Sequence, residues 1–167
     1  NILATDVVTF TATAENAITY TSSDSTIAYV SETNQLLIQS AGTITITAHA
    51  AESETHESAQ VSKEIIISKA TPIITALPVV TPFGYGQILE MIALEGGTAD
   101  VKGNFVWNTD LTQVLNAGTH EVAITFVPTA NTIYNAVDTI VMVLVDPIAQ
   151  TIEWNAKDTT IKVSEVI

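Results

Sequence analysis

Residues 43–50 have the sequence TITITAHA, in which isoleucine and alanine alternate with threonine and histidine. Successive side chains of a β-strand point to opposite faces, so this stretch puts one apolar row inward and one hydroxyl-rich row outward. Residues 8–14 repeat the pattern, with Val8, Phe10 and Ala12 alternating with threonines. Threonine suits the outer row because it is both β-branched and polar. Both stretches therefore predict half-buried β-strands.

The rest of the chain has the same character, and no stretch shows sustained helical spacing. Residues 50–60 have some helical propensity but lack an apolar face at 3.6-residue spacing, so we expect a polar loop there. Short strands with frequent turn signals are typical of sandwiches of two antiparallel sheets. We expect further strands at 17–21, 27–31, 35–39, 61–68, 73–77, 88–94, 103–108, 119–127, 137–145, 150–155 and 160–167.

Composition and charge exclude several classes of protein. The 167 residues include five basic and eighteen acidic side chains, a net charge of −13, and no cysteine. Disulfides and thiolate metal sites are therefore impossible, and five scattered lysines cannot form the basic face of a nucleic-acid binder. The longest apolar run, residues 140–145, is far shorter than the roughly 20 residues that span a bilayer, so we expect no membrane insertion. No N-terminal signal pattern is present, which indicates a fragment of a longer chain.

Two prolines mark boundaries between units. Each follows the last strand of one unit and opens the next, at Thr71-Pro72-Ile73 and at Asp146-Pro147-Ile148. Proline lacks an N–H group, so it suits the first residue of an edge strand. We therefore divide the chain into unit one (1–69), unit two (70–146) and a tail (147–167) that begins a further unit. The connections are too short for flexible tethers, so we expect neighbouring units to hold a restricted orientation.

Internal similarity indicates a tandem array. The sequence IKVSEVI at residues 161–167 resembles ILATDVV at residues 2–8, with hydroxyl and acidic positions matched. The sequence AGT at residues 41–43 recurs at residues 117–119, and each copy precedes a strand, a polar loop and a strand. Such self-similarity is the mark of repeat proteins. The chain therefore spans slightly more than one period of a longer array.

This alignment has a consequence for the two ends. Unit one lacks the equivalent of residues 150–155, its first strand, whereas the tail carries that strand. An open sheet edge invites a strand from another chain. We hypothesise that residues 147–167 of one molecule complete unit one of a neighbour, head to tail, by pairing with residues 7–14.

Unit one resembles the bacterial immunoglobulin-like domain of group 2, found in intimin and invasin-like surface proteins. The residues that carry this resemblance are ITYTSSD (18–24), IAYVS (27–31), LLI (36–38) and SAGTITITA (40–48), and QTIEW (150–154) of the tail resembles the opening strand of the same family. Unit two resembles the YGX-type modules of large bacterial surface proteins. Its matching residues are YGQ (85–87), LEGGTA (94–99), FVW (105–107), NAGT (116–119), FVP (126–128) and YN (134–135).

These resemblances imply an all-β fold of tandem immunoglobulin-like antiparallel β-sandwiches. They also imply a non-catalytic role, as spacer or stalk modules of an extracellular or cell-surface bacterial adhesin-like protein. The partners would be neighbouring modules of the same chain. Two alternatives stay open: a module that binds carbohydrate or a host glycoprotein, and an accessory region of a large surface enzyme.

Few residues are candidates for a site. His49, His56 and His120 are scattered and accompany no serine elbow or cysteine, so we predict no catalytic constellation and no enzyme activity. Glu52 and Glu54 alternate as calcium ligands often do, but no Asp-x-Asp-x-Asp-Gly run supports a loop site, and we interpret them as a solvated acidic loop.

Four other residues are candidates for a metal site or a sugar site. Asp146 lies at a unit junction, where some arrays bind calcium, but we expect no metal and no cofactor. Tyr134, beside Asn135 in a loop, is the best candidate for an exposed sugar-stacking ring. The loops near Gly96-Gly97 are the other candidate place for a carbohydrate ligand. Trp107 and Trp154 lie in alternating apolar rows and are predicted to face the core.

Overall fold

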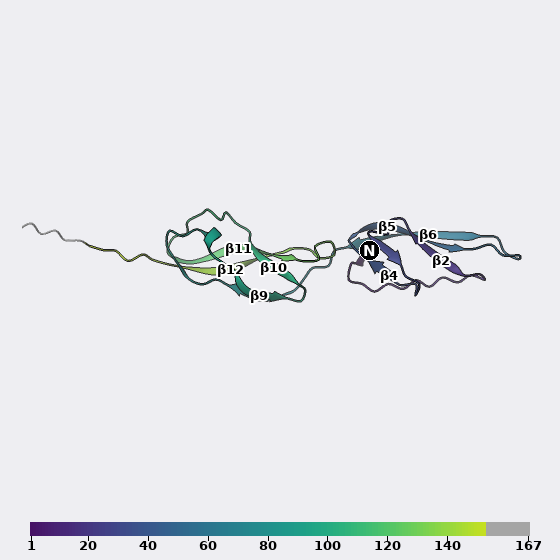
Figure 1. Cartoon of the computed structure of the whole chain (residues 1–167), viewed down its shortest axis with the longest axis horizontal. Coiled ribbons are helices and arrows are strands. Elements are labelled where there is room, and N and C mark those ends of the chain that lie inside the picture. Colours follow the sequence, from purple (N-terminus) through teal and green to yellow (C-terminus); the bar gives the residue numbers. More distant parts are fainter. Residues whose placement is uncertain (153–167) are drawn as a thin grey trace, which may run out of the picture.

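The computed structural model describes residues 1–152, and its regular structure is almost entirely β. Figure 1 shows two elongated lobes joined end to end, which are unit one and unit two. Unit one contains β1 (Ile2–Leu3), β2 (Ile18–Ser22), β3 (Ala28–Val30), β4 (Leu36–Ile38), β5 (Gly42–Ala50) and β6 (Ala59–Ser68). Unit two contains β7 (Ile74–Val79), β8 (Phe83–Gly84), the 3₁₀ turn η1 (Leu89–Met91), β9 (Glu95–Ala99), β10 (Gly103–Trp107), β11 (Gly118–Pro128) and β12 (Val137–Asp146).

Each unit has one four-stranded sheet, and the two sheets share one design. The order is β1-β6-β5-β2 in unit one and β8-β12-β11-β10 in unit two. The three long strands of each sheet pair antiparallel. The short outer strand of each sheet runs parallel to the last long strand, with Ile2 opposite Ile67 in unit one and Phe83 opposite Val145 in unit two.

The second layers of the two units differ. In unit one the second layer is the antiparallel hairpin of β3 and β4, and Thr9 joins it through a single bridge to Gln35. In unit two the second layer pairs β7 antiparallel with β9. A separate bridge joins Ile88 to Val114. Both units are therefore sandwich-like, but each closes its core with different strands.

Each unit buries its own core between its layers. The core of unit one comprises Ala4, Ala28, Leu36, Ile44, Ile46 and Ile67. The core of unit two comprises Val80, Phe83, Leu89, Val122, Ile124, Val141, Val143 and Val145. No polar or charged side chain is buried in the described residues. Burial of alternate strand residues, rather than polar networks, therefore stabilises both units.

The alternating pattern predicts the strands well where it is regular. In β5, Ile44 and Ile46 are buried and the threonines between them are more exposed, as expected. All the other predicted strands of residues 17–68 and 103–145 occur within two residues of their expected bounds. The polar loop expected near residues 50–60 is present at residues 51–58.

Three strand predictions are wrong in the described residues. Residues 88–94 do not form a strand, because Leu89 enters the core from the 3₁₀ turn η1. Of residues 8–14, only Thr9 forms a bridge, to Gln35 beside β4, so they are no continuous strand. Residues 150–152 have no regular structure and are exposed, and the rest of the strands predicted at 150–155 and 160–167 lies outside the described residues.

Strand β9 was not predicted, because its sequence EGGTA has low strand propensity. Gly97 has a φ of +79°, and a Cβ atom built there would lie 2.6 Å from Cε2 of Phe105 and 2.9 Å from the backbone nitrogen of Pro78. Glycine at this position therefore lets the Phe105 ring and β7 approach the strand closely.

Candidate functional site at the junction between the units

A loop of unit two contacts the end of unit one. The loop comprises residues 129–136, which connect β11 to β12, and we call it the junction loop. The backbone N–H of Ala41 donates a hydrogen bond of 2.9 Å to the carbonyl oxygen of Thr132. The hydroxyl of Thr132 donates in turn to the carbonyl oxygen of Gln39, at 3.3 Å. The loop thus bonds to the turn that precedes β5.

The same loop holds the connection between the units. The N–H of Ala70 donates to the carbonyl of Ile133 at 2.9 Å, and the N–H of Asn135 donates to the carbonyl of Ala70 at 2.8 Å. These bonds form a parallel bridge between Ala70 and Tyr134. The side-chain amide of Asn135 also donates to the hydroxyl of Thr71 at 3.2 Å. The linker is therefore held against the junction loop by backbone and side-chain hydrogen bonds.

An apolar contact accompanies these hydrogen bonds. The side chain of Ile133 is half-buried and packs against the core of unit one, although its backbone belongs to unit two. A tight turn presents it, since the N–H groups of Ile133 and Tyr134 both donate to the carbonyl of Ala130, at 3.2 and 3.1 Å. Hydrogen bonds fix direction and apolar burial adds stability, so together they restrict the angle between the units.

The equivalent loop of unit one has a different character. Residues 51–58, between β5 and β6, have the sequence AESETHES and are all exposed. Glu52 and Glu54 lie there, and the loop is organised by the Ser53 hydroxyl, which accepts hydrogen bonds from the N–H groups of Thr55 and His56. No three His, Asp or Glu side chains of residues 1–152 gather closely enough to hold a metal ion. Asp146 is exposed at the end of β12, far along the chain from that loop.

The aromatic candidates Tyr134 and Trp107 are both half-buried. Tyr134 is half-buried at the junction, where its backbone bridges to Ala70, so it is no freely exposed ring. Gly96 and Gly97 belong to strand β9 rather than to a loop, which corrects the site suggested for a sugar ligand. Trp107 packs against the core of unit two, and its indole N–H donates to the carbonyl of Ile92 at 3.0 Å.

The three histidines contact separate groups. His49 Nε2 lies 3.0 Å from the hydroxyl of Thr21, and His56 Nδ1 lies 2.8 Å from the hydroxyl of Thr55. His120 Nε2 donates to the carbonyl oxygen of Asn116 at 2.7 Å. Each partner is a hydroxyl or a carbonyl of a nearby strand or turn.

Two carboxyl groups have a pKa below the ordinary value, for the same reason. The side chain of Asp24 accepts hydrogen bonds from the hydroxyl (2.6 Å) and the N–H (2.9 Å) of Thr26, which lower its pKa. Asp110 accepts the corresponding bonds from Thr112, at 2.7 and 2.9 Å, and its pKa is lowered likewise. Both are Asp-x-Thr turns. Each follows the antiparallel edge strand of its four-stranded sheet, β2 or β10, so the two units contain the same turn at equivalent places.

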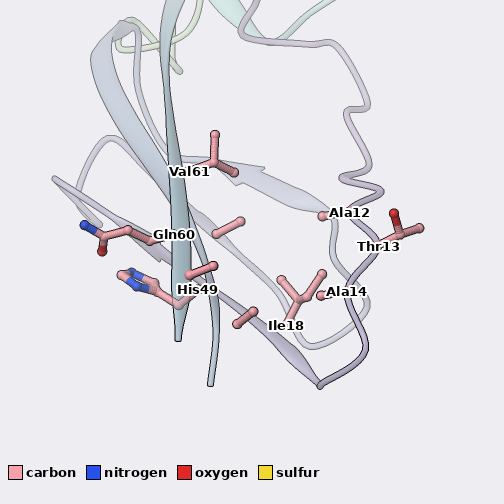
Figure 2. Close-up of a pocket in the computed structure, with 10 residues that line it drawn as sticks. Ala12, Thr13, Ala14, Ile18, His49, Gln60 and Val61 are labelled. Atoms are coloured by element: carbon pink, nitrogen blue, oxygen red, sulfur yellow. The ribbon is translucent and has the colours of Figure 1, made fainter. Parts of the chain in front are cut away.

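A groove opens the side of unit one, and sequence reasoning did not locate it. It runs between residues 8–14 and the first half of β6, and we call it the side groove. Its deeper part has a volume of about 380 Å³ and its end a further hollow of about 170 Å³. Figure 2 shows the end hollow, with Ala12 and Ala14 across from the strand that carries Val61. Apart from Lys63 and His49, its lining is uncharged.

Comparison with known proteins identifies no family for this chain. Among residues 1–152 no helix has the length and apolar character needed to cross a bilayer. A scan of protein-family models found no family that matches the chain, and a search of curated proteins found no similar sequence.

Proposed function

We propose that the chain is a non-catalytic spacer within a bacterial cell-surface or secreted adhesin-like protein. In this role, immunoglobulin-like units in tandem hold a binding region away from the envelope. The observation that carries the proposal is the junction, where a loop of unit two and the linker form one hydrogen-bonded contact and Ile133 packs against the core of unit one. A spacer keeps its two ends apart only when its joints resist bending. The hydrogen bonds and the Ile133 contact oppose bending at this joint.

The repetition of the units supports the same proposal. Both four-stranded sheets have the same order and the same parallel outer strand, and both place an Asp-x-Thr turn after the equivalent strand. Repeat proteins extend by adding copies of one unit with similar neighbour contacts. The high negative charge supports solubility of an extended molecule and repels other acidic surfaces.

The proposal is tested by measuring how stiff the junction is. We expect small-angle X-ray scattering of the full chain to show one extended shape, with little bending between the units. Substitution of Ile133→Ser removes the apolar contact, so the scattering should broaden toward a distribution of bent shapes while each unit keeps its circular dichroism. Ile140→Ser is the matched control, because Ile140 is exposed on β12 and lies outside the junction.

Two results would contradict the proposal. One is a wild-type chain whose units already tumble independently, as measured by separate rotational correlation times in NMR relaxation. The other is a saturable glycan ligand whose binding is lost on substitution of Tyr134→Ala, which would favour the carbohydrate-binding alternative.

A further inference from the structure

We propose that the side groove of unit one is a docking site for residues 147–155 of a second copy of this chain. The segment has the sequence PIAQTIEWN, and it would add a strand beside residues 8–14. Repeated from copy to copy, this contact is heterologous and builds a linear, head-to-tail filament. The inference concerns assembly and does not depend on the spacer role.

The groove offers unpaired backbone along one edge. Residues 8–14 already bond to the hairpin of β3 and β4 on one side, through Phe10 N–H to the Asn34 carbonyl and Leu36 N–H to the Val8 carbonyl, both at 2.8 Å. Neighbouring residues of an extended chain direct their backbone groups to opposite sides. Thr9 and Thr11 therefore face the other edge, and within residues 1–152 their N–H groups donate to no backbone oxygen.

The groove is lined by small side chains and lacks a covering strand. Alanines form much of the wall, and the one large aliphatic residue on its β6 side, Val61, is 68% exposed. Val61 thus lies uncovered at the wall that an incoming strand would contact. The lining alanines are Ala12, Ala14, Ala48, Ala50 and Ala59. An incoming strand with large side chains would fill the space that these residues leave.

The tail has the complementary property. Ile148 and Ile152 are 65% and 86% exposed, and the described part of the tail, residues 147–152, has no regular structure. Ile148, Ile152 and Trp154 stand at even positions, so they share one face when the segment is extended. The tail thus exposes large apolar side chains, and unit one has a largely uncharged groove that no described residue fills.

Unit two contains a strand pairing of the kind proposed, between β7 and β9. Strand β7 follows the buried Pro72 and pairs antiparallel with β9, with which it forms the second layer. Residues 147–155 open with Pro147 after the last strand of unit two, and Pro72 likewise stands between the last strand of unit one and β7. The tail therefore has the sequence context of a covering strand.

The tail cannot reach the groove of its own molecule. The groove lies at the end of β5 away from the junction, and the tail leaves β12 at the opposite end of unit two (Figure 1). Strands of nine and ten residues extend about 30 Å and about 33 Å at roughly 3.3 Å per residue. A nine-residue segment spans at most about 32 Å, which is too short to pass both strands. Residues 147–155 that occupy the groove must therefore come from another copy.

Electrostatics predicts a salt dependence for this contact. Each copy carries a net charge of −13, so two copies repel one another over a distance set by ionic strength. Locally, Lys63 lines the groove and residues 147–155 carry Glu153 and no basic residue. Salt screens the long-range repulsion more than the apolar contact, so association should strengthen as salt is added.

The test is sedimentation velocity of the full chain in high salt over a wide concentration range, and a filament-forming contact should give dimers and longer species. Ile152→Asp in the tail and Ala12→Glu in the groove should each weaken association by at least about tenfold, since burial of one aliphatic side chain contributes about that factor. Both residues are exposed in the single chain, so neither change should unfold it. Thr109→Glu, in an exposed loop of unit two, is the control for added charge and should associate as wild type does.

Mixing the two variants makes the test specific for head-to-tail contact. The Ile152→Asp chain keeps an intact groove and the Ala12→Glu chain keeps an intact tail, so an equimolar mixture should form a dimer and nothing larger. A synthetic peptide of residues 147–155 should bind the Ile152→Asp chain, with a blue shift of Trp154 emission, but should not bind the Ala12→Glu chain. The proposal is overturned if the wild type stays monomeric and the peptide does not bind, or if the mixture stays monomeric while the wild type associates.

Discussion

The last strands of the two units, β6 and β12, occupy the same place in equivalent sheets but are buried to very different degrees. Gly42 pairs with Ile67 in unit one and Gly118 pairs with Val145 in unit two, which aligns the two strand pairs. Along the inner row of β12, three valines (Val141, Val143 and Val145) are buried in succession. Along the inner row of β6, only Ile67 is buried, Ile65 is half-buried, and Lys63 and Val61 are exposed.

The neighbouring strands repeat the contrast. The far half of β11 presents Ile124 and Phe126, both fully buried, and the ring of Phe126 lies 5.1 Å from that of Phe105. The corresponding positions of β5 are Ala48 and Ala50, which are only half-buried. Unit two thus packs large side chains under a layer that includes β7, whereas unit one has small side chains and no strand equivalent to β7 in the described residues.

This difference shows what β7 contributes to unit two. The four-stranded sheet, the parallel outer strand and the Asp-x-Thr turn form in both units, so none of them requires a strand like β7. What β7 changes is the burial of one end of the sandwich, where apolar area of unit one is in contact with water in the described residues. Substitutions in the two sheets can therefore measure the contrast.

The largest expected effect is in the core of unit two. Phe126→Ala should lower the free energy of unfolding of unit two by about 3–5 kcal/mol, through lost burial and the cavity left behind. That is a large part of the roughly 5–15 kcal/mol that stabilises a typical domain. Urea denaturation followed by NMR signals assigned to each unit measures the effect. Equal destabilisation of both units would mean that they unfold together and that the comparison between them fails.

A smaller effect separates the two terminal strands. Val141 is 5% exposed and Val61 is 68% exposed. Val141→Ala should therefore cost about 2 kcal/mol, and Val61→Ala less than about 0.5 kcal/mol, in urea denaturation of dilute protein. If Val61→Ala costs as much as Val141→Ala under these conditions, the side groove is closed in solution and the contrast is lost. A cost that appears only in concentrated protein would instead sharpen it, because a second copy would then cover Val61.

The smallest effect concerns the feature that both units share. Hydrogen bonds from Thr26 and Thr112 lower the pKa of Asp24 and of Asp110 below the ordinary value of 3.8 in the folded chain. A depressed folded-state pKa means that the stabilisation is present above the unfolded value and is lost as pH falls through the folded one. Asp24→Asn and Asp110→Asn should each lower the melting temperature slightly at neutral pH, and the difference from wild type should shrink in acid.

NMR titration of the two carboxyl groups checks the cause directly. Both should titrate below the value of an exposed aspartate, and by similar amounts, because the two turns have nearly the same hydrogen-bond distances. An unshifted group in one unit only would show that the turns are not equivalent in solution.

Regular alternation made most strands predictable, and its failures have physical causes. The apolar residues 88–94 suit a strand or a turn equally well, and the buried position of Leu89 in η1 decides between them. Strand β9 has almost no side chains to signal it, since Gly96 and Gly97 serve the approach of the Phe105 ring. Residues 8–14 have the pattern of a strand but pair on one side only, and a pattern cannot report whether its second neighbour is present.

The amino-acid sequence by itself determined the β class, the acidic surface, the absence of thiol chemistry and the two proline-marked boundaries proposed for the units, because alternation, charge and proline geometry are local properties. Only the tertiary structure revealed the junction and the side groove. The Thr132 hydroxyl and the Gln39 carbonyl are 93 residues apart, and residues 8–14 face a strand some 50 residues further along the chain. Contacts over such separations depend on how whole layers pack, and no local pattern specifies which side chains then meet and which edge stays open.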